Sequence, residues 1–104
     1  MFLYSIADKV VFSILKRINV GFLEVTTFSG VVLKFGNPND KLKTNLKINT
    51  PALNYNLIKG GSVGFAECYM RDEFETHNLS DLIELTARNI NIVHKFAGLL
   101  DLKF

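Results

Sequence analysis

The sequence is poor in cysteine, proline and tryptophan, and it has no long hydrophobic segment. It contains one cysteine, two prolines and no tryptophan in 104 residues. A single thiol, Cys68, excludes an internal disulfide framework and a cysteine-based zinc cluster, and it fits a reduced cytosolic setting. No apolar run approaches the roughly 18–20 residues that a membrane-spanning helix requires. The 48% hydrophobic and 21% charged residues are those of a globular chain. We therefore expect one small cytoplasmic domain.

The charge balance indicates little about partners. The formal net charge is only +2, and lysines outnumber arginines nine to three. Arginine is the residue that recognises bases and phosphates through two parallel hydrogen bonds, so this ratio disfavours a nucleic-acid reader. We expect no nucleic-acid partner.

The N-terminal segment 2–19 has the period of an amphipathic helix, with Gly21 as a suitable stop. Its apolar residues fall on one broad face, and Phe12 falls in the middle of the polar face. A single exposed aromatic side chain is ordinary on a protein surface. The alternative is that Phe12 makes an apolar contact with lipid or with a partner domain.

The next segments have the two-residue period of strands. Residues 22–28 and 31–35 flank Ser29-Gly30 and predict a tight antiparallel hairpin. Residues 41–49 alternate between apolar and polar side chains, which indicates one buried face and one wet face. The wet face carries Lys41, Lys43 and Lys47. Such lysines protect a solvated strand against aggregation, or they form a positively charged surface that attracts anionic head groups.

The second half of the chain predicts a short helix, a strand and a long helix. Thr50-Pro51 is a helix start, and Gly60 ends that helix. The glycine-containing run 62–70 is interpreted as a strand, and Asn78 caps one helix over about 79–97. The order predicts an α+β fold, in which helices pack on one face of an antiparallel sheet of about five strands.

The residues that could support chemistry do not form a catalytic constellation. His77 and His94 lack a second ligand at metal spacing, so we expect no metal site. Cys68 is interpreted as a buried, inert thiol. If 62–70 is a strand, Glu67 lies between two aromatic rings on one face. It is then either a solvated carboxylate or one that holds backbone amides or a cationic group. We identify no catalytic residue.

The region from about residue 20 to 95 resembles the N-terminal domain of the cyclopropane-fatty-acyl-phospholipid synthase family. The resemblance depends on a glycine-rich motif that ends in glutamate-x-tyrosine-methionine, followed by an aromatic residue and a leucine-rich helix. The motif residues in this chain are Gly61, Gly64, Glu67, Tyr69 and Met70, followed by Phe74, Leu79, Leu82, Leu85, Arg88 and Asn89. The chain departs from the family pattern at Ala66 and at 71–73.

The resemblance implies a domain without catalytic activity of its own. In that family, methyl transfer from S-adenosylmethionine belongs to a separate domain, so this chain alone is expected to hold no cofactor. The N-terminal domain of the family is similar to sterol-carrier-type lipid-binding folds. We expect residues 1–97 to form the accessory domain, and 98–104 to be a tail or the start of a linker to a catalytic domain.

Two functional hypotheses follow. The first is a domain that engages lipid or a membrane, peripheral at the inner membrane surface, and takes part in fatty-acid biosynthesis. Its candidate contact residues are Phe12, Lys41, Lys43, Lys47, Phe65, Tyr69 and Phe74. The alternative is a protein-interaction module that docks on a methyltransferase, supplied in cis or in trans, or forms a homodimer.

Overall fold

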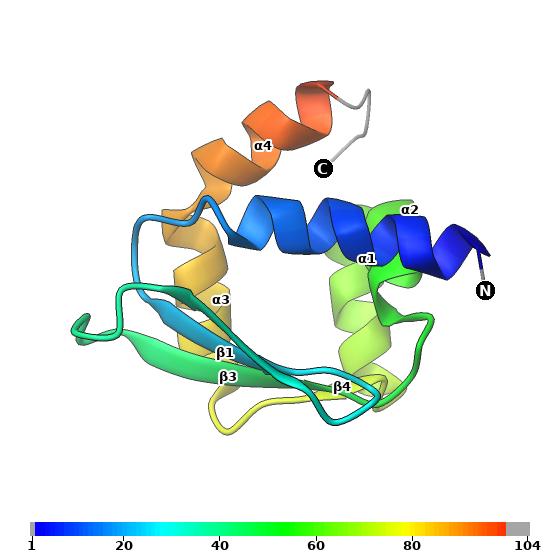
Figure 1. The fold of residues 1–104 in the computed structure, drawn as a ribbon, viewed down its shortest axis with the longest axis horizontal. Coiled ribbons are helices and arrows are strands. Elements are labelled where there is room, and N and C mark those ends of the chain that lie inside the picture. Colours follow the sequence, from blue (N-terminus) through cyan, green and yellow to red (C-terminus); the bar gives the residue numbers. More distant parts are fainter. Residues whose placement is uncertain (1, 100–104) are drawn as a thin grey trace.

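The computed structural model describes the backbone of residues 2–99 and the side chains of residues 2–95. In this range the elements are α1 (Phe2–Leu15), β1 (Phe22–Thr26), β2 (Val32–Gly36), β3 (Lys43–Ile48), α2 (Leu53–Met70), β4 (Phe74–Glu75), α3 (Leu79–Arg88) and α4 (Ile90–Leu99). Figure 1 shows α1 running above the sheet, with α2 and α3 toward its opposite ends. The α+β class is confirmed. Helix α4 includes Leu99, and the rest of the tail expected at 98–104 lies outside the described residues.

The sheet has four described strands in the order β2-β1-β3-β4, and it is mixed. The hairpin β1–β2 and the pair β3–β4 are antiparallel, but β1 and β3 are parallel. The prediction of about five antiparallel strands was therefore wrong. Three short strands in succession are antiparallel only if each pairs with the next. Here β3 pairs with β1 and not with β2. The segment that connects the parallel strands β1 and β3 contains β2 itself.

The alternation predicted for 41–49 is confirmed. Thr44 and Ile48 are buried on the face toward the helices, while Lys43 and Lys47 are exposed on the other. The same side of the sheet buries Leu23, Val25, Phe35 and Phe74. One face of the sheet thus forms the floor of the core, and the other carries the charged side chains.

The loop from β2 to β3 is held to the start of β1 by Asp40. Its carboxylate accepts hydrogen bonds from the backbone N–H of Leu42 and of Gly21, both at 2.9 Å. The Leu42 bond is the main cause, and the Gly21 bond the second, of an Asp40 pKa below its usual value. This carboxylate therefore joins the segments that lead into β1 and β3, where the two parallel strands begin side by side.

Helix α1 buries a wider arc than its sequence period predicts. It contacts α2 through the rings of Tyr4 and Tyr55, whose centroids are 5.6 Å apart. Phe12, expected on the polar face, is half-buried and stacks on Phe35 of the sheet at 6.2 Å. The prediction of an exposed Phe12 was wrong, because α1 is covered on two sides rather than one. Its first turns extend past the core and leave apolar side chains exposed.

Residues 62–70 are helical, so the strand predicted there was wrong. They form the second half of α2, which bends at Gly61, where φ is 59° and ψ is −139°. This combination lies close to a region that essentially only glycine occupies. After the bend, Gly64 and Cys68 face the core, and a Cβ on Gly64 would lie 3.0 Å from the carbonyl oxygen of Asn56. The glycines therefore bend a helix and let its halves approach, rather than mark a strand.

The helix predicted over 79–97 is broken into α3 and α4. Asn78 caps α3 as predicted, accepting a hydrogen bond from the backbone N–H of Asp81 at 3.1 Å. The break falls at Asn89, whose side chain is 2% exposed. This side chain makes hydrogen bonds to the backbone of the segment between α1 and β1. These bonds hold Asn89 in place at the end of α3, and α4 starts from it in a new direction.

Candidate functional site

An apolar cavity of about 150 Å³ lies between the core face of the sheet and the helices. Its lining comes from α1, β1, β3, α2, α3 and α4: Val11, Phe12, Ile14, Leu15, Leu23, Val25, Leu46, Ile48, Asn54, Leu57, Ile58, Phe65, Leu82, Thr86 and Val93. Aliphatic and aromatic groups dominate this list. A cavity of this size and lining stays dry in other proteins and accommodates a benzene molecule.

The two polar side chains of the lining are already hydrogen-bonded. The amide nitrogen of Asn54 donates to Asp8 of α1 at 3.0 Å. The Thr86 hydroxyl donates to the Leu82 carbonyl oxygen at 2.9 Å. Because each of these side chains already makes a hydrogen bond within the protein, the wall offers mainly methyl and ring surface, which suits an apolar guest.

Two aromatic residues line both the cavity and hollows at the surface. Phe12 lines both the cavity and a hollow of about 420 Å³ at the edge of β2. Phe65 and Thr86 line both the cavity and a groove of about 220 Å³ beside α3 and α4. Phe12 and Phe65, two of the predicted contact residues, therefore lie where the cavity and the surface hollows share lining.

The other predicted aromatic residues gather beside Phe65. The ring centroid of Phe74 is 5.2 Å from that of Phe65 and 5.6 Å from that of Tyr69. Phe74 is 1% exposed, whereas Tyr69 is 41% exposed. Phe74 thus supports Phe65 from within the core, and only Tyr69 of this pair reaches the surface.

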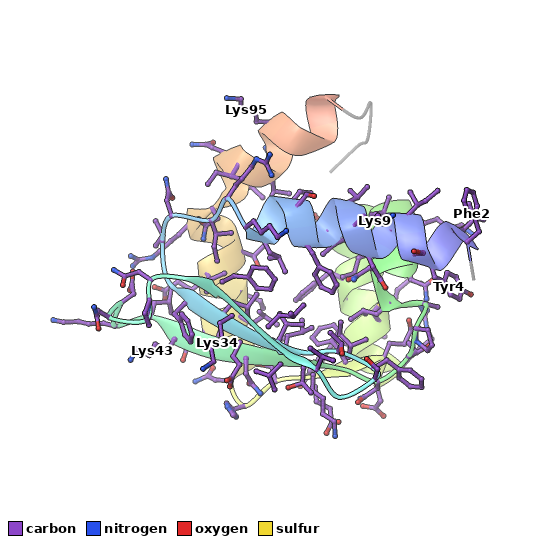
Figure 2. All side chains as sticks on the ribbon, in the orientation of Figure 1. Phe2, Tyr4, Lys9, Lys34, Lys43 and Lys95 are labelled. Carbon is purple, nitrogen blue, oxygen red and sulfur yellow. The ribbon has the colours of Figure 1, made fainter. Side chains whose placement is uncertain are left out.

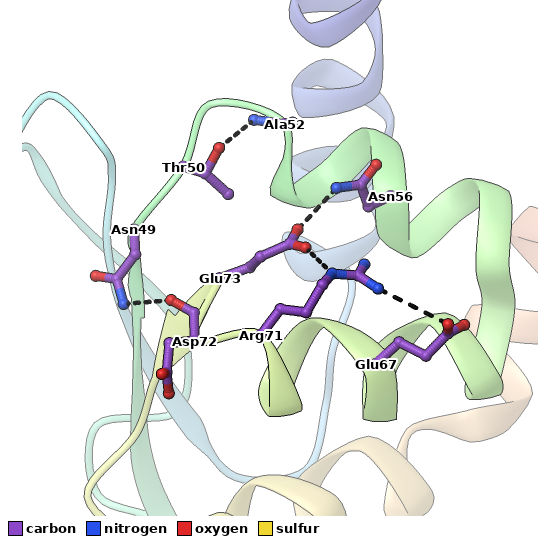
Figure 3. A network of polar contacts seen from close by, with 8 residues as sticks. All are labelled: Asn49, Thr50, Ala52, Asn56, Glu67, Arg71, Asp72 and Glu73. Atoms are coloured by element: carbon purple, nitrogen blue, oxygen red, sulfur yellow. Dashed lines mark hydrogen bonds and ion pairs between the residues drawn. The ribbon is translucent and has the colours of Figure 1, made fainter.

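The acidic residue of the motif belongs to a polar network at the end of α2 (Figure 3). Arg71 contacts Glu67 at 3.7 Å and bonds Glu73 through Nε at 2.6 Å. Glu73 also accepts a hydrogen bond from Asn56 at 2.7 Å. Burial acts to raise the pKa of Glu73, but the hydrogen bonds from Asn56 and Arg71 outweigh it, so this pKa is lowered. The network ties the two halves of α2 together, and Glu67 holds a cationic partner from an exposed helical position.

The remaining motif residues have structural positions. Gly61 and Gly64 allow the bend in α2, and Met70 is 77% exposed at its end. Cys68 is fully buried, and burial raises the pKa of its thiol to about 11. At this pKa the thiol is an inert packing group.

The predicted lysines do not form a uniform positive strip. Lys43 and Lys47 project from the open face of the sheet, and Lys41 is exposed just before β3. The Nζ of Lys47 lies 3.9 Å from a carboxylate oxygen of Glu75 on the neighbouring strand. Glu24 lies between Lys34 and Asn45 in the register of the sheet, so acidic groups interrupt the strip. Figure 2 shows Lys34 and Lys43 on the sheet side of the molecule, away from Phe2 and Tyr4.

Within residues 2–99, no three potential metal-ligating side chains lie together, and no helix has the length and hydropathy of a membrane span. The sequence matches no protein-family model, and no curated protein or solved structure is significantly similar to it. The class that the structure defines is an α+β domain with a partly open apolar cavity. The resemblance to the cyclopropane synthase family stays a prediction.

Proposed function

We propose that this protein is a non-catalytic accessory domain that engages lipid by accepting an apolar chain in its cavity. The observation that carries the proposal is the cavity of about 150 Å³ lined by aliphatic and aromatic side chains. The lining offers no thiol and no ionisable side chain, which favours binding over a reaction. The resemblance to an N-terminal synthase domain supports the same role, with S-adenosylmethionine bound by a different domain.

The cavity volume limits how much of a lipid it accepts. At about 30 Å³ for each small group, the cavity holds about five methylene groups. Each buried methylene contributes about 0.8 kcal/mol, so the chain end contributes at most about 4 kcal/mol. The cost of association reduces this gain, so the Kd is about 1 mM or weaker. The domain is therefore proposed to bind the end of an acyl chain weakly. Weak binding suits a module that passes lipid on to a second domain.

The exposed start of α1 supports contact with a membrane surface. Phe2, Leu3 and Ile6 are 77%, 50% and 44% exposed, and Figure 2 shows Phe2 at the far end of α1. An apolar helix end of this kind inserts shallowly among lipid head groups. The domain is thus proposed to be peripheral at the membrane. Its lysines add a weak attraction to anionic head groups, and salt screens that attraction.

A cavity-filling variant tests the lipid proposal. Val11→Phe adds a ring at a half-buried lining position, and Val31→Phe adds the same ring at a position that is 54% exposed. Octanol is titrated into isotope-labelled protein while amide resonances are followed. We expect saturable shifts around the cavity in the parent and in V31F, and none in V11F. If V11F does not fold, Thr86→Leu replaces it, and no saturable shift in the parent refutes the proposal.

Vesicle co-sedimentation tests the membrane part separately. We expect anionic phospholipid vesicles to retain the parent at low salt and to release Phe2→Ser/Ile6→Ser. Val63→Ser removes a side chain that is 69% exposed on α2 and is the matched control. Equal sedimentation of all three proteins, or no binding at low salt, counts against membrane contact.

The groove beside α3 favours one alternative, a docking or dimerisation module. Ile83 and Ile90 line it and are 50% and 36% exposed. Under this alternative, sedimentation velocity shows a concentration-dependent dimer, or a complex with a methyltransferase, that Ile83→Lys abolishes. A monomer at all concentrations, with no methyltransferase bound, counts against it.

A further inference from the structure

We propose that the outer edge of β2, the side that faces away from β1, binds an extended peptide segment of another protein. The segment adds to the sheet as a further strand, with an acidic side chain opposite Lys34 and apolar side chains next to it. β2 is the terminal strand in the order β2-β1-β3-β4, and no strand of the described residues pairs with its outer edge. Docking at this edge is independent of the lipid cavity, so it goes beyond the function proposed above.

The hydrogen bonds of the β1–β2 hairpin show which backbone groups face β1. The Thr27 N–H donates to the Val31 carbonyl oxygen at 2.8 Å, and the Asn37 N–H donates to the Gly21 carbonyl oxygen at 3.0 Å. Hydrogen-bonded and non-hydrogen-bonded pairs alternate along an antiparallel ladder. The odd-numbered residues of 31–37 therefore turn their N–H and carbonyl groups toward β1.

The even-numbered residues Val32, Lys34 and Gly36 consequently point their backbone N–H and carbonyl groups away from β1. All three residues are exposed. A free edge of this kind pairs with the backbone of an extended chain, which offers acceptors and donors at the same spacing. The unpaired groups thus specify an extended partner rather than a helical one.

The helix side of this edge has room for side chains of an added strand. A hollow of about 420 Å³ lies there, lined by Phe12, Lys16 and residues 33–36. Leu33 and Phe35 lie on the core face of the sheet, and the Phe12 ring stacks on Phe35. Because side chains alternate across a strand, every second side chain of the added segment lies over this hollow. Its ring and aliphatic lining favours apolar side chains there.

The open face of the same edge favours an acidic side chain. Lys34 lies on this face, opposite Glu24 of β1 in the strand register. Lys34 is exposed and takes part in no salt bridge among the described residues. A carboxylate on the added strand, opposite Lys34, places the ammonium group between two acidic neighbours. Opposite charges paired across strands stabilise the pairing.

A second copy of this chain fits the edge less well. The antiparallel pairing of two copies that uses Val32, Lys34 and Gly36 places the two Lys34 side chains directly opposite one another. Like charges in this position destabilise the pairing. The charge of the edge therefore favours an acidic segment of another protein.

The test titrates the peptide acetyl-Ser-Thr-Val-Glu-Val-Thr-Ser-amide into the isotope-labelled full chain, while amide shifts and hydrogen exchange are followed. One control peptide is N-methylated at the glutamate and so lacks one backbone donor, and a second has lysine in place of glutamate. The protein variants are Lys34→Glu and Val32→Pro. Val32 is the first residue of an edge strand, where proline is tolerated. Lys43→Glu is the matched control, since Lys43 is exposed on the same face but on the inner strand β3.

We expect the glutamate peptide to shift the amides of Val32, Lys34 and Gly36 and to slow their exchange. V32P is expected to bind about two- to tenfold more weakly, the effect of one lost hydrogen bond. K34E is expected to bind about two- to thirtyfold more weakly, because an attraction becomes a repulsion. The lysine peptide restores binding to K34E, and K43E binds the glutamate peptide like the parent.

No saturable shift of the parent at millimolar peptide overturns the proposal, and so does equal binding of the N-methylated peptide. Equal weakening by K43E and K34E indicates a general effect of surface charge and also overturns it. A dimer in sedimentation velocity that protects the Val32 and Lys34 amides without peptide assigns the edge to a second copy instead. If V32P does not fold, K34E with the lysine peptide decides the outcome. Each of these failures leaves the octanol test of the cavity unaffected.

Discussion

Replacing Asn89 with alanine is expected to destabilise the domain strongly, because this one side chain joins three parts of the chain. Its Oδ1 accepts hydrogen bonds from the backbone N–H of Asn19 at 3.0 Å and of Val20 at 3.2 Å. Its Nδ2 donates to the carbonyl oxygens of Val20 and Leu85, both at 2.8 Å. The side chain is 2% exposed, so water does not replace these bonds at the amide itself.

The size of the effect follows from the number of bonds lost. Each hydrogen bond contributes about 1 kcal/mol net, and the Leu85 carbonyl keeps a second bond from the Asn89 backbone N–H. We therefore expect Asn89→Ala to cost about 3 kcal/mol. A domain of this size has a free energy of unfolding of about 5–15 kcal/mol, so roughly a fifth to three fifths of the stability is lost.

Urea denaturation followed by circular dichroism measures this loss. With an m value of about 1–3 kcal/mol/M, the midpoint falls by about 1–3 M. Asn91→Ala, at an exposed position in the first turn of α4, is the matched control and is expected to change little. Asn89→Asp keeps the oxygen that accepts the two backbone hydrogen bonds but loses the amide donor, and it is expected to recover stability when acid protonates the new carboxyl group. A cost below about 1 kcal/mol for N89A, or a cost equal to that of N91A, would show that the buried amide of Asn89 does not hold these segments together.

Three further predictions concern stability and reactivity. Gly61→Ala is expected to cost about 1–3 kcal/mol, because φ is positive there. Gly60→Ala, where a Cβ meets nothing within 4 Å, is expected to gain about 0.5–1 kcal/mol, and equal thermal melts for the two variants contradict this. The stability from Asp40 is present above its ordinary pKa of 3.8 and is lost as pH falls through the lowered value. The difference in free energy of unfolding between the parent and Asp40→Asn therefore narrows in acid. A difference that does not change with pH contradicts the stabilising role of the Asp40 carboxylate. Cys68, with a pKa of about 11, is expected to react with a disulfide reagent at least about a hundredfold more slowly in the native protein than in urea. Equal labelling rates contradict its burial.

Local signals in the sequence were sufficient for the hairpin and for the start of α3. The hairpin connects residues adjacent in sequence, and the turn between β1 and β2 closes with a hydrogen bond from the Gly30 N–H to the Thr27 carbonyl oxygen. Asn78 caps the helix that follows it directly. Both predictions concern contacts within a few residues, where backbone geometry and side-chain hydrogen bonding decide the outcome.

The glycine-rich run shows where local reasoning failed. Glycine disfavours helix and strand alike, so Gly61 and Gly64 gave no reliable sign of either. The helical spacing of the buried positions Gly61, Gly64 and Cys68 was present in the sequence. It became decisive only once the second half of α2 packed against Phe74 and the first half. Tertiary contacts therefore overrode the strand-like composition.

The sequence alone was sufficient to predict the α+β class, the buried face of 41–49 and the hairpin. These features depend on period, composition and neighbours along the chain. Only the tertiary structure decided that β3 pairs with β1, that Asn89 divides the last helix, and that Phe12 and Phe65 wall an apolar cavity. Each of these depends on residues far apart in sequence meeting in space. A cavity in particular is the volume that packed side chains leave unfilled, and no single segment encodes it.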